Sequence, residues 1–244
     1  MEPAAYEEMA AQQDRHWWFV ARRRILADTV GRLGLPPGAR ILEAGAGTGG
    51  NLPMLARFGS VQALEMDEQA RAFAHRRAPD IEVRPGRLPD QLPFDAGSFD
   101  LICLFDVLEH VDQDRAALTA LRTLAAPGGR AVLTVPACPW LWSHHDERLH
   151  HHRRYTRATL RDVVQASGWR LRRLTAFNTL LFPLAVAGRL ADRLRGDQAA
   201  PAGQAMPPVP LNAVLRSVFG AEAALLALTD LPYGVSLMAV LDRD

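Results

Sequence analysis

The chain of 244 residues is 48% hydrophobic, which is enough apolar material for the core of one ordinary domain. Its 28 basic and 27 acidic residues leave a net charge of +1, so no overall field draws the molecule onto nucleic acid, and we expect no nucleic-acid partner. Apart from histidine every basic residue is arginine, which excludes Schiff-base and lysine-base mechanisms.

Helices are predicted first, over residues 5–34. Their apolar positions recur at helical spacing from Trp17 to Leu33, and the turn at 35–38 ends them. The N-terminal stretch is acidic and lacks the basic-then-apolar order of a signal peptide, so we expect a cytoplasmic protein.

The segment 41–52, ILEAGAGTGGNL, predicts a strand that runs into a nucleoside-binding turn. Gly45, Gly47 and Gly49 can adopt positive φ and let the backbone approach a ligand, while the next helix directs N–H groups to the same place. Glu43, at the end of the strand, would repel a pyrophosphate but attract a ligand ammonium group.

The next apolar segment, VQALEMD at 61–67, contains Glu65 about twenty residues past the first glycine. A carboxylate at this position suits two ribose hydroxyls, and each such charge-assisted hydrogen bond contributes roughly 1.5 to 3 kcal/mol. The two segments together predict an adenosine-like ligand that lacks a pyrophosphate.

Strand patterns alternate with helical patterns along much of the chain, which indicates a parallel α/β fold. The segments at 99–104 and 130–135 are apolar at consecutive positions, as strands are when helices cover both faces of a sheet. Cys103 and Cys138 are too few and too far apart for a disulfide framework or a zinc site, so we expect core thiols. The predicted strands are 40–44, 61–65, 81–83, 99–104, 130–135, 170–176 and 235–241.

The segment 183–231 interrupts this alternation with an Arg-edged amphipathic helix, a Pro/Ala/Gly linker at 197–210 and a second helix. We expect the two helices to pack onto the edge of the sheet; a substrate lid, a homodimer contact and a peripheral membrane surface are the alternatives. The longest apolar run, at 177–188, is shorter than the roughly 20 residues that span a bilayer and contains Asn178 and Pro183, so no transmembrane helix is predicted.

Two further motifs are LPFDAGSFD at 92–100 and APGG at 126–129, which precede the predicted fourth and fifth strands. With Glu43, the glycine turn and Glu65, they make residues 40–176 resemble a class I S-adenosylmethionine-dependent methyltransferase, similar to the small-molecule O-methyltransferases of the ubiquinone pathway. The resemblance implies a doubly wound, Rossmann-like seven-stranded α/β sheet with the last strand antiparallel. It also implies a single domain over 1–244, with a helical cap at 1–39, a core at 40–182, a helical insertion at 183–231 and the last strand at 232–244.

The resemblance implies S-adenosylmethionine as the cofactor and S-adenosylhomocysteine as its product. Glu43 and the glycine turn would hold the methionine part, Glu65 would hold the ribose, and Met66 would flank the adenine. The whole implied cofactor-binding set is Glu43, Gly45, Gly47, Gly49, Glu65, Met66, Leu88, Phe105, Asp106 and His110.

The chain departs from the family pattern after the predicted third strand. The family often places an acid there to meet the adenine amino group, but Gly86 is followed by Arg87 and Leu88. Asp90 or a backbone carbonyl could make this contact instead.

The element FDVLEHV, residues 105–111, resembles the DxxEH element of the same methyltransferases, where Phe105 and Asp106 would lie beside the cofactor. Asp106 and Glu109 also have the spacing of a capping box, which would stabilise the next helix by about 1 kcal/mol. By analogy with that subgroup, Asp106, Glu109 and His110 could hold a divalent ion, but three such groups at one helix start could equally be solvated. We expect no metal.

The segment 136–156, which follows the predicted fifth strand, concentrates histidines, acids and arginines at the strand end where open α/β sheets bind ligands. It resembles the HD…H.RRY element of a bacterial subgroup of small-molecule methyltransferases. A histidine held by a carboxylate can accelerate deprotonation of a hydroxyl by about 100- to 10,000-fold, so our catalytic candidates are His145 or His151 oriented by Asp146. The alternative is a solvated loop whose arginines face water.

The segment HWWFVARRR, residues 16–24, could cover the cofactor with Trp18 and Phe19 while Arg22 reaches its carboxylate, or could be a helix docked by its aromatic residues.

The predicted function is methyl transfer to a hydroxyl or amine of a small metabolite. A nicotinamide-dependent oxidoreductase shares the glycine turn, but a Tyr/Lys catalytic pair needs a lysine that the chain lacks. A non-catalytic module that binds S-adenosylmethionine is the third alternative.

Overall fold

A computed structural model describes residues 3–195 and 206–244, so most of the predicted linker at 197–210 lies outside the described residues. Within them a single mixed sheet of seven strands has the order β3-β2-β1-β4-β5-β7-β6. Neighbouring strands are parallel except for β7, which is antiparallel to β5 and β6, and this confirms the predicted fold class. The strands are β1 (Arg40–Ala44), β2 (Ser60–Glu65), β3 (Glu82–Pro85), β4 (Phe99–Phe105), β5 (Ala125–Pro136), β6 (Arg170–Phe177) and β7 (Ser236–Asp242).

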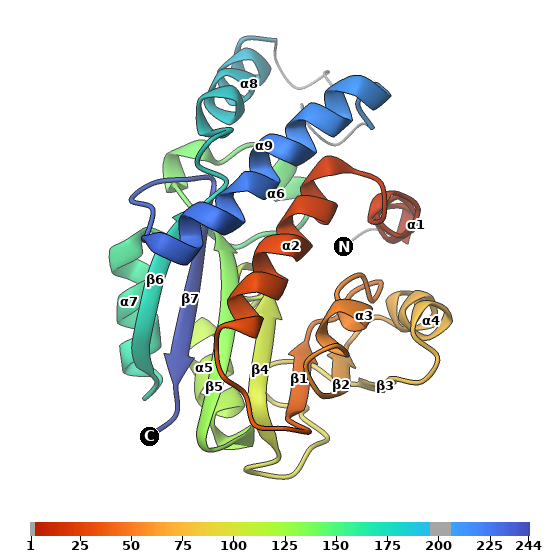
Figure 1. The fold of residues 1–244 in the computed structure, drawn as a ribbon, viewed down its shortest axis with the longest axis vertical. Helices are drawn as coiled ribbons and strands as arrows, with labels where there is room; N and C mark the ends of the chain where they lie inside the picture. The colour runs from red at the N-terminus through yellow and green to blue at the C-terminus, as the bar shows by residue number, and fades with distance from the viewer. Residues whose placement is uncertain (1–2, 196–205) are drawn as a thin grey trace.

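Helices cover both faces of the sheet, with α2 and α9 crossing one face and α5 and α7 on the other (Figure 1). Strands β4 and β5 alternate between the two cores, so Leu101 packs on the side of α2 while Ile102 packs on the side of α5. The helices are α1 (Pro3–Gln12), α2 (Trp17–Gly31), α3 (Leu52–Leu55), α4 (Glu68–Arg77), η1 (Leu108–His110), α5 (Asp114–Leu124), η2 (Pro139–Leu141), α6 (His144–Arg148), α7 (Arg157–Ala166), α8 (Phe182–Arg195) and α9 (Val209–Leu228).

The second helix of the 183–231 insertion, α9, packs on the edge strand β6, as expected, and continues over that face of the sheet beside α2. It does so because Leu215, Phe219 and Leu226 recur at helical spacing and are buried. Phe219 stacks on Phe177 of β6 with ring centroids 6.2 Å apart. By length and composition alone α9 is also the one helix in the described residues that could cross a bilayer, with 28% of its apolar window buried in the fold.

Strand β5 begins earlier than the pattern at 130–135 predicts. Ala125 pairs with Phe99 across a register shift, so the APGG turn lies inside the strand and not before it. The sheet thus extends at the amino ends of β4 and β5, which is the edge opposite the site described below.

Candidate cofactor and acceptor site

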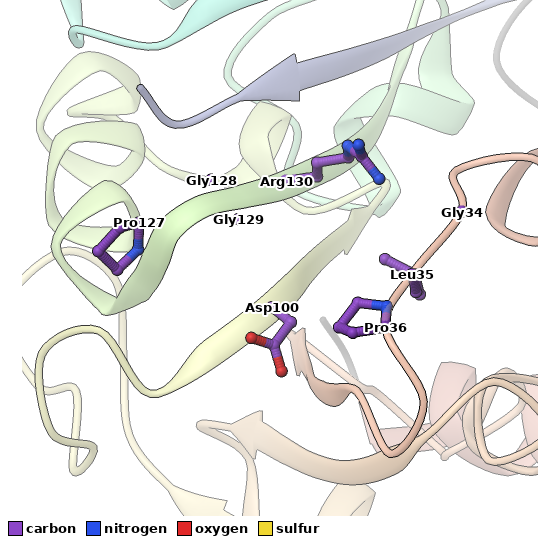
Figure 2. Close-up of a pocket in the computed structure, with 8 residues that line it drawn as sticks. All are labelled: Gly34, Leu35, Pro36, Asp100, Pro127, Gly128, Gly129 and Arg130. Carbon is purple, nitrogen blue, oxygen red and sulfur yellow. The ribbon is translucent and has the colours of Figure 1, made fainter.

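The predicted site residues gather at the carboxyl ends of β1, β2, β4 and β5. A cavity of about 310 Å³ lies at the opposite edge, between the segment before β1 and the starts of β4 and β5 (Figure 2). Its acidic side chain, Asp100, already binds Arg40 through both carboxylate oxygens. Because open α/β sheets bind ligands at the carboxyl ends of their strands, the candidate site is the first of these two places.

The three glycines of the turn have different roles. All have positive φ, but a Cβ on Gly45 would lie 2.5 Å from Val107 Cγ2, and a Cβ on Gly49 would lie 2.8 Å from Ala74 Cα. A Cβ on Gly47 would meet no heavy atom within 4 Å in the described structure. Gly45 and Gly49 are therefore needed for packing within the fold, whereas Gly47 leaves open space at the tip of the turn.

Alanine substitutions should separate these roles. We expect Gly45→Ala to lower the free energy of unfolding by about 2 to 4 kcal/mol, because it combines positive φ with a clash. Gly47→Ala should cost only about 1 kcal/mol but should weaken binding of S-adenosylhomocysteine, since its methyl group enters the open space. Urea denaturation and calorimetric titration measure the two effects; a Gly47→Ala protein with unchanged affinity would place the ligand elsewhere.

Glu43 is the penultimate residue of β1, just before this turn, and is only 1% exposed. Its Oε1 accepts a hydrogen bond of 2.8 Å from Asn51, but its Oε2 is buried without a partner among the described residues. Burial raises the pKa of Glu43 to about 7, although Asn51 and Arg22 act in the other direction. A buried acceptor that lacks a donor fits the ammonium group of a methionine moiety, so this part of the site suits S-adenosylmethionine.

Glu65 ends β2 on the other side of the glycine turn. Its two oxygens accept backbone hydrogen bonds of 2.8 Å from Gly47 and 2.9 Å from Asp67. Burial raises the pKa of Glu65, while these two hydrogen bonds lower it. The next residue, Met66, is 64% exposed, as a side chain that packs on an adenine ring must be before the ligand binds.

The two residues considered for cofactor contacts beyond β3 differ in their exposure. Leu88 is buried in the core that contains α5, whereas Asp90, the alternative partner for the adenine amino group, is exposed. The adenine contacts therefore stay a prediction.

The N-terminal helices cover the glycine turn, and sequence reasoning found only part of this cover. The Gln13 amide lies 3.0 Å from the Thr48 hydroxyl, and Asp14 forms an ion pair of 2.9 Å with Arg77 of α4. Tyr6 of α1 is buried near Glu65, and burial together with that carboxylate raises its pKa. Helix α1 thus lies across the turn and α4, within the segment 1–39 that we expected to form a helical cap, although we assigned cofactor contacts only to residues 16–24.

Arg22 of α2 reaches the site at the ends of β4 and β5. It donates hydrogen bonds to Asp106 and to the Thr134 hydroxyl, and its guanidinium lies 4.9 Å from the ring of Trp18 and 5.6 Å from that of Phe105. The Arg22 Nε is buried without a partner in the described part of the chain. Whether Arg22 also meets a ligand carboxylate stays a prediction.

The predicted capping box at Asp106 and Glu109 was wrong. Asp106 has φ of 56° and uses its side chain on Arg22 and Thr134, so it caps no helix. The three-residue helix η1 follows Val107, and α5 begins only at Asp114. The reason is that the buried Arg22 needs a carboxylate partner, and this outweighs the roughly 1 kcal/mol of a cap.

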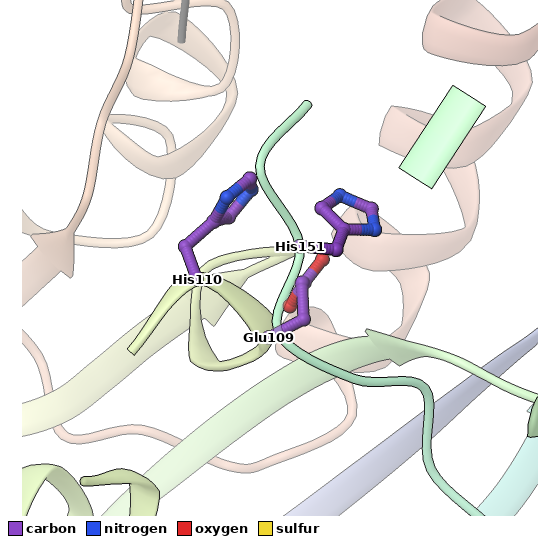
Figure 3. Close-up of side chains that lie close together, drawn as sticks. All are labelled: Glu109, His110 and His151. Atoms are coloured by element: carbon purple, nitrogen blue, oxygen red, sulfur yellow. The ribbon is translucent and has the colours of Figure 1, made fainter. Parts of the chain in front are cut away.

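The loop after β5 folds back onto η1 and brings His151 next to Glu109 and His110 (Figure 3). The backbone N–H of His152 donates to the carbonyl of Glu109 at 2.8 Å, which fixes the register of the two segments. The rings of His110 and His151 are 4.7 Å apart and nearly perpendicular. Burial and the neighbouring His151 lower the pKa of His110 to about 4.

The predicted pairing of a histidine with Asp146 is present for His151. Asp146 is completely buried; its Oδ1 lies 2.9 Å from His151 Nδ1 and accepts a 2.8 Å hydrogen bond from Arg154. Burial alone would raise the pKa of Asp146, but the hydrogen bond from His151 and the charge of Arg154 hold it well below its ordinary range. Asp146 is therefore an ionised carboxylate that orients the His151 ring.

The other histidines of this loop differ from His151. His144, His150 and His152 are exposed, so the alternative of a solvated loop holds for them. His145 lies in α6, but its side chain is outside the described residues, and its catalytic role stays a prediction.

Comparison with known proteins places this geometry in a family. A family model described as a methyltransferase domain matches residues 18–174. A demethylmenaquinone methyltransferase from Renibacterium salmoninarum is 34% identical over 122 residues, which are 50% of this chain and 48% of that protein. A ubiquinone biosynthesis O-methyltransferase from Xanthomonas axonopodis pv. citri is 32% identical over 104 residues, which are 41% of this chain and 44% of that protein. The chain thus spans about half the length of the curated relatives it matches.

Among solved structures, a geranyl diphosphate C-methyltransferase from Streptomyces coelicolor A3(2), in complex with Mg²⁺, geranyl diphosphate and S-adenosyl-L-homocysteine, has a similar fold. The match has a TM-score of 0.61 at 16% identity and covers 90% of this chain and 78% of that one. The fold and the match to the family model lead to the same conclusion. The chain belongs to the class I S-adenosylmethionine-dependent methyltransferases, enzymes whose cofactor is S-adenosylmethionine.

Proposed function

We propose that this chain transfers the methyl group of S-adenosylmethionine to a hydroxyl, or less favourably an amine, of a small metabolite. The observation that carries the proposal is the buried Asp146–His151 pair at the sheet edge where the glycine turn and Glu43 also lie. The relatives named for ubiquinone and demethylmenaquinone methylation support a small-molecule acceptor.

The cofactor supplies an activated methyl group on a sulfonium centre. In the transfer the acceptor oxygen forms a bond to the methyl carbon while the carbon–sulfur bond breaks and its electron pair stays on sulfur. Holding the two reactants in line supplies much of the roughly 7 to 11 kcal/mol available from proximity. The chain must provide that alignment and a route for the hydroxyl proton.

The proton route is assigned to His151. Its Nδ1 is held by Asp146, so the ring orientation is fixed and Nε2 is the nitrogen on the far side of the ring from that carboxylate. Asp146 acts through His151 and is a positioning residue. Arg154 keeps Asp146 ionised and also donates to the Ala137 carbonyl, which ties the pair to the end of β5.

A donor-consumption screen tests the proposal. The full chain is incubated with S-adenosylmethionine and panels of phenols, sugar alcohols and amines, and S-adenosylhomocysteine is measured by mass spectrometry. We expect release of this product with at least one hydroxyl acceptor. Tight binding of S-adenosylmethionine without transfer to any acceptor class would support a non-catalytic binding module instead.

A further inference from the structure

The strongest unexplained feature of the site is the side chain of Glu109. It is 0% exposed, and neither carboxylate oxygen has a hydrogen-bond partner among the residues that the structure describes. A buried carboxylate without any partner is unfavourable as a bare anion, so such a group either takes up a proton or binds a cation.

Two imidazoles stand beside this carboxylate. One potential ligand atom each from Glu109, His110 and His151 lies within 4.8 Å of the others (Figure 3). The set joins η1 to the loop after β5, and the hydrogen bond from His152 to Glu109 holds the two segments together. Two histidine nitrogens and one carboxylate oxygen form a typical three-ligand set for a divalent transition metal with open positions.

The surroundings also have the features of a metal site. The carboxylate of Asp146 lies 2.9 Å from Nδ1 of His151, and a carboxylate in this position orients metal-binding histidines in many proteins. Asp106 is not part of the set because Arg22 and Thr134 occupy its oxygens. The set therefore differs from the Asp106, Glu109 and His110 group that the family analogy indicates.

We propose that Glu109, His110 and His151 bind one divalent transition-metal ion of the zinc class. Imidazole ligands favour Zn²⁺, Co²⁺ and Ni²⁺, whereas Mg²⁺ prefers oxygen ligands and retains its water. Three protein ligands leave open positions. With the ion bound, Nε2 of His151 would be a ligand and not a proton acceptor, and an acceptor hydroxyl at an open position would lose its proton to solvent instead. This catalytic consequence rests on the proposed function; the binding itself does not.

The binding test uses the full chain, stripped of metal, with Co²⁺ and Zn²⁺ as probes. We expect one Co²⁺ per chain with a visible absorption spectrum, displacement by Zn²⁺, and no response to Mg²⁺. Glu109→Gln and His110→Gln should each weaken binding by at least about tenfold, and Asp146→Asn by about 10- to 100-fold. His144→Ala and His152→Ala are the matched controls, since both side chains are exposed in the same loop, and they should bind as the wild type does.

Circular dichroism and thermal melting establish that each variant is folded; His110→Gln carries the test if Glu109→Gln does not fold, because His110 is only half-buried. The proposal is overturned if the wild type binds no ion, or if the control variants lose binding as much as the ligand variants do.

Chelation separates this proposal from the proposed function. Transfer that survives removal of metal but fails in His151→Ala would keep methyl transfer and reject a catalytic role of the ion, while the Co²⁺ titration alone decides whether the ion binds. Stoichiometric binding of Co²⁺ by a chain that transfers no methyl group would support the metal site and reject the proposed function.

Discussion

Replacing His151 with alanine is expected to lower turnover by about 100- to 10,000-fold while leaving the affinity for S-adenosylhomocysteine unchanged. The reason is that His151 handles the acceptor proton and lies on the acceptor side, whereas the ligand ammonium and ribose are assigned to Glu43 and Glu65 across the glycine turn. Steady-state kinetics with the acceptor found in the screen and calorimetry with the product measure the two quantities separately.

The matched control for this prediction is His152→Ala. This neighbour is exposed, so its removal should change neither turnover nor affinity. Asp146→Asn should lower turnover through misorientation of the ring, with little change in KM. Equal turnover in the wild type and the His151 variant would remove the Asp146–His151 pair from the chemistry.

Replacing Glu43 with glutamine is expected to stabilise the free protein above pH 7 and to weaken ligand binding. Because the folded-state pKa is raised to about 7 from 4.5, the contribution of Glu43 to stability is fully present below pH 4.5 and is lost as the pH rises through 7. The loss for the wild type is on the order of 3 kcal/mol, and Glu43→Gln should not show it. Urea denaturation at pH 4 and pH 8 measures the difference.

The same substitution should weaken ligand binding, although it stabilises the free protein above pH 7. An ammonium group restores the charged form of Glu43, so the wild type should bind S-adenosylhomocysteine about 10- to 100-fold more tightly than Glu43→Gln at pH 8, with a smaller gap at pH 6. Glu68→Gln, at an exposed position, is the control and should alter neither property. A Glu43→Gln protein that binds the ligand normally at pH 8 would show that the ammonium group lies elsewhere.

Local patterns explain why the places of Glu43, the glycine turn and Glu65 in the fold could be predicted from sequence. Glu43 lies near the end of β1, the glycine turn follows β1 directly, and Glu65 ends β2. The carboxyl ends of adjacent parallel strands meet at one edge of a sheet. The packing roles of Gly45 and Gly49 could not be predicted in this way. The atoms that a Cβ would meet at these two positions belong to Val107 and Ala74, which are distant in sequence.

The proposed acceptor half of the site depends on tertiary contacts that no local spacing encodes. Glu109 and His151 belong to segments after different strands, and they meet only because the loop after β5 returns to η1. The same applies to Asp106, whose spacing to Glu109 fits a cap but whose side chain is bound by Arg22 from α2. The cover formed by Tyr6 and Gln13 carries no sequence motif at all.

The claim on which the rest depends is that the turn and the buried Glu43 form a site for a zwitterionic thioether nucleoside. Isothermal titration of the full chain at pH 8 with S-adenosylhomocysteine, and separately with NADH, tests it directly. We predict saturable heat with one S-adenosylhomocysteine per chain, a weaker isotherm for Glu43→Gln, and no binding of NADH. Saturation by NADH with no response to S-adenosylhomocysteine would contradict it.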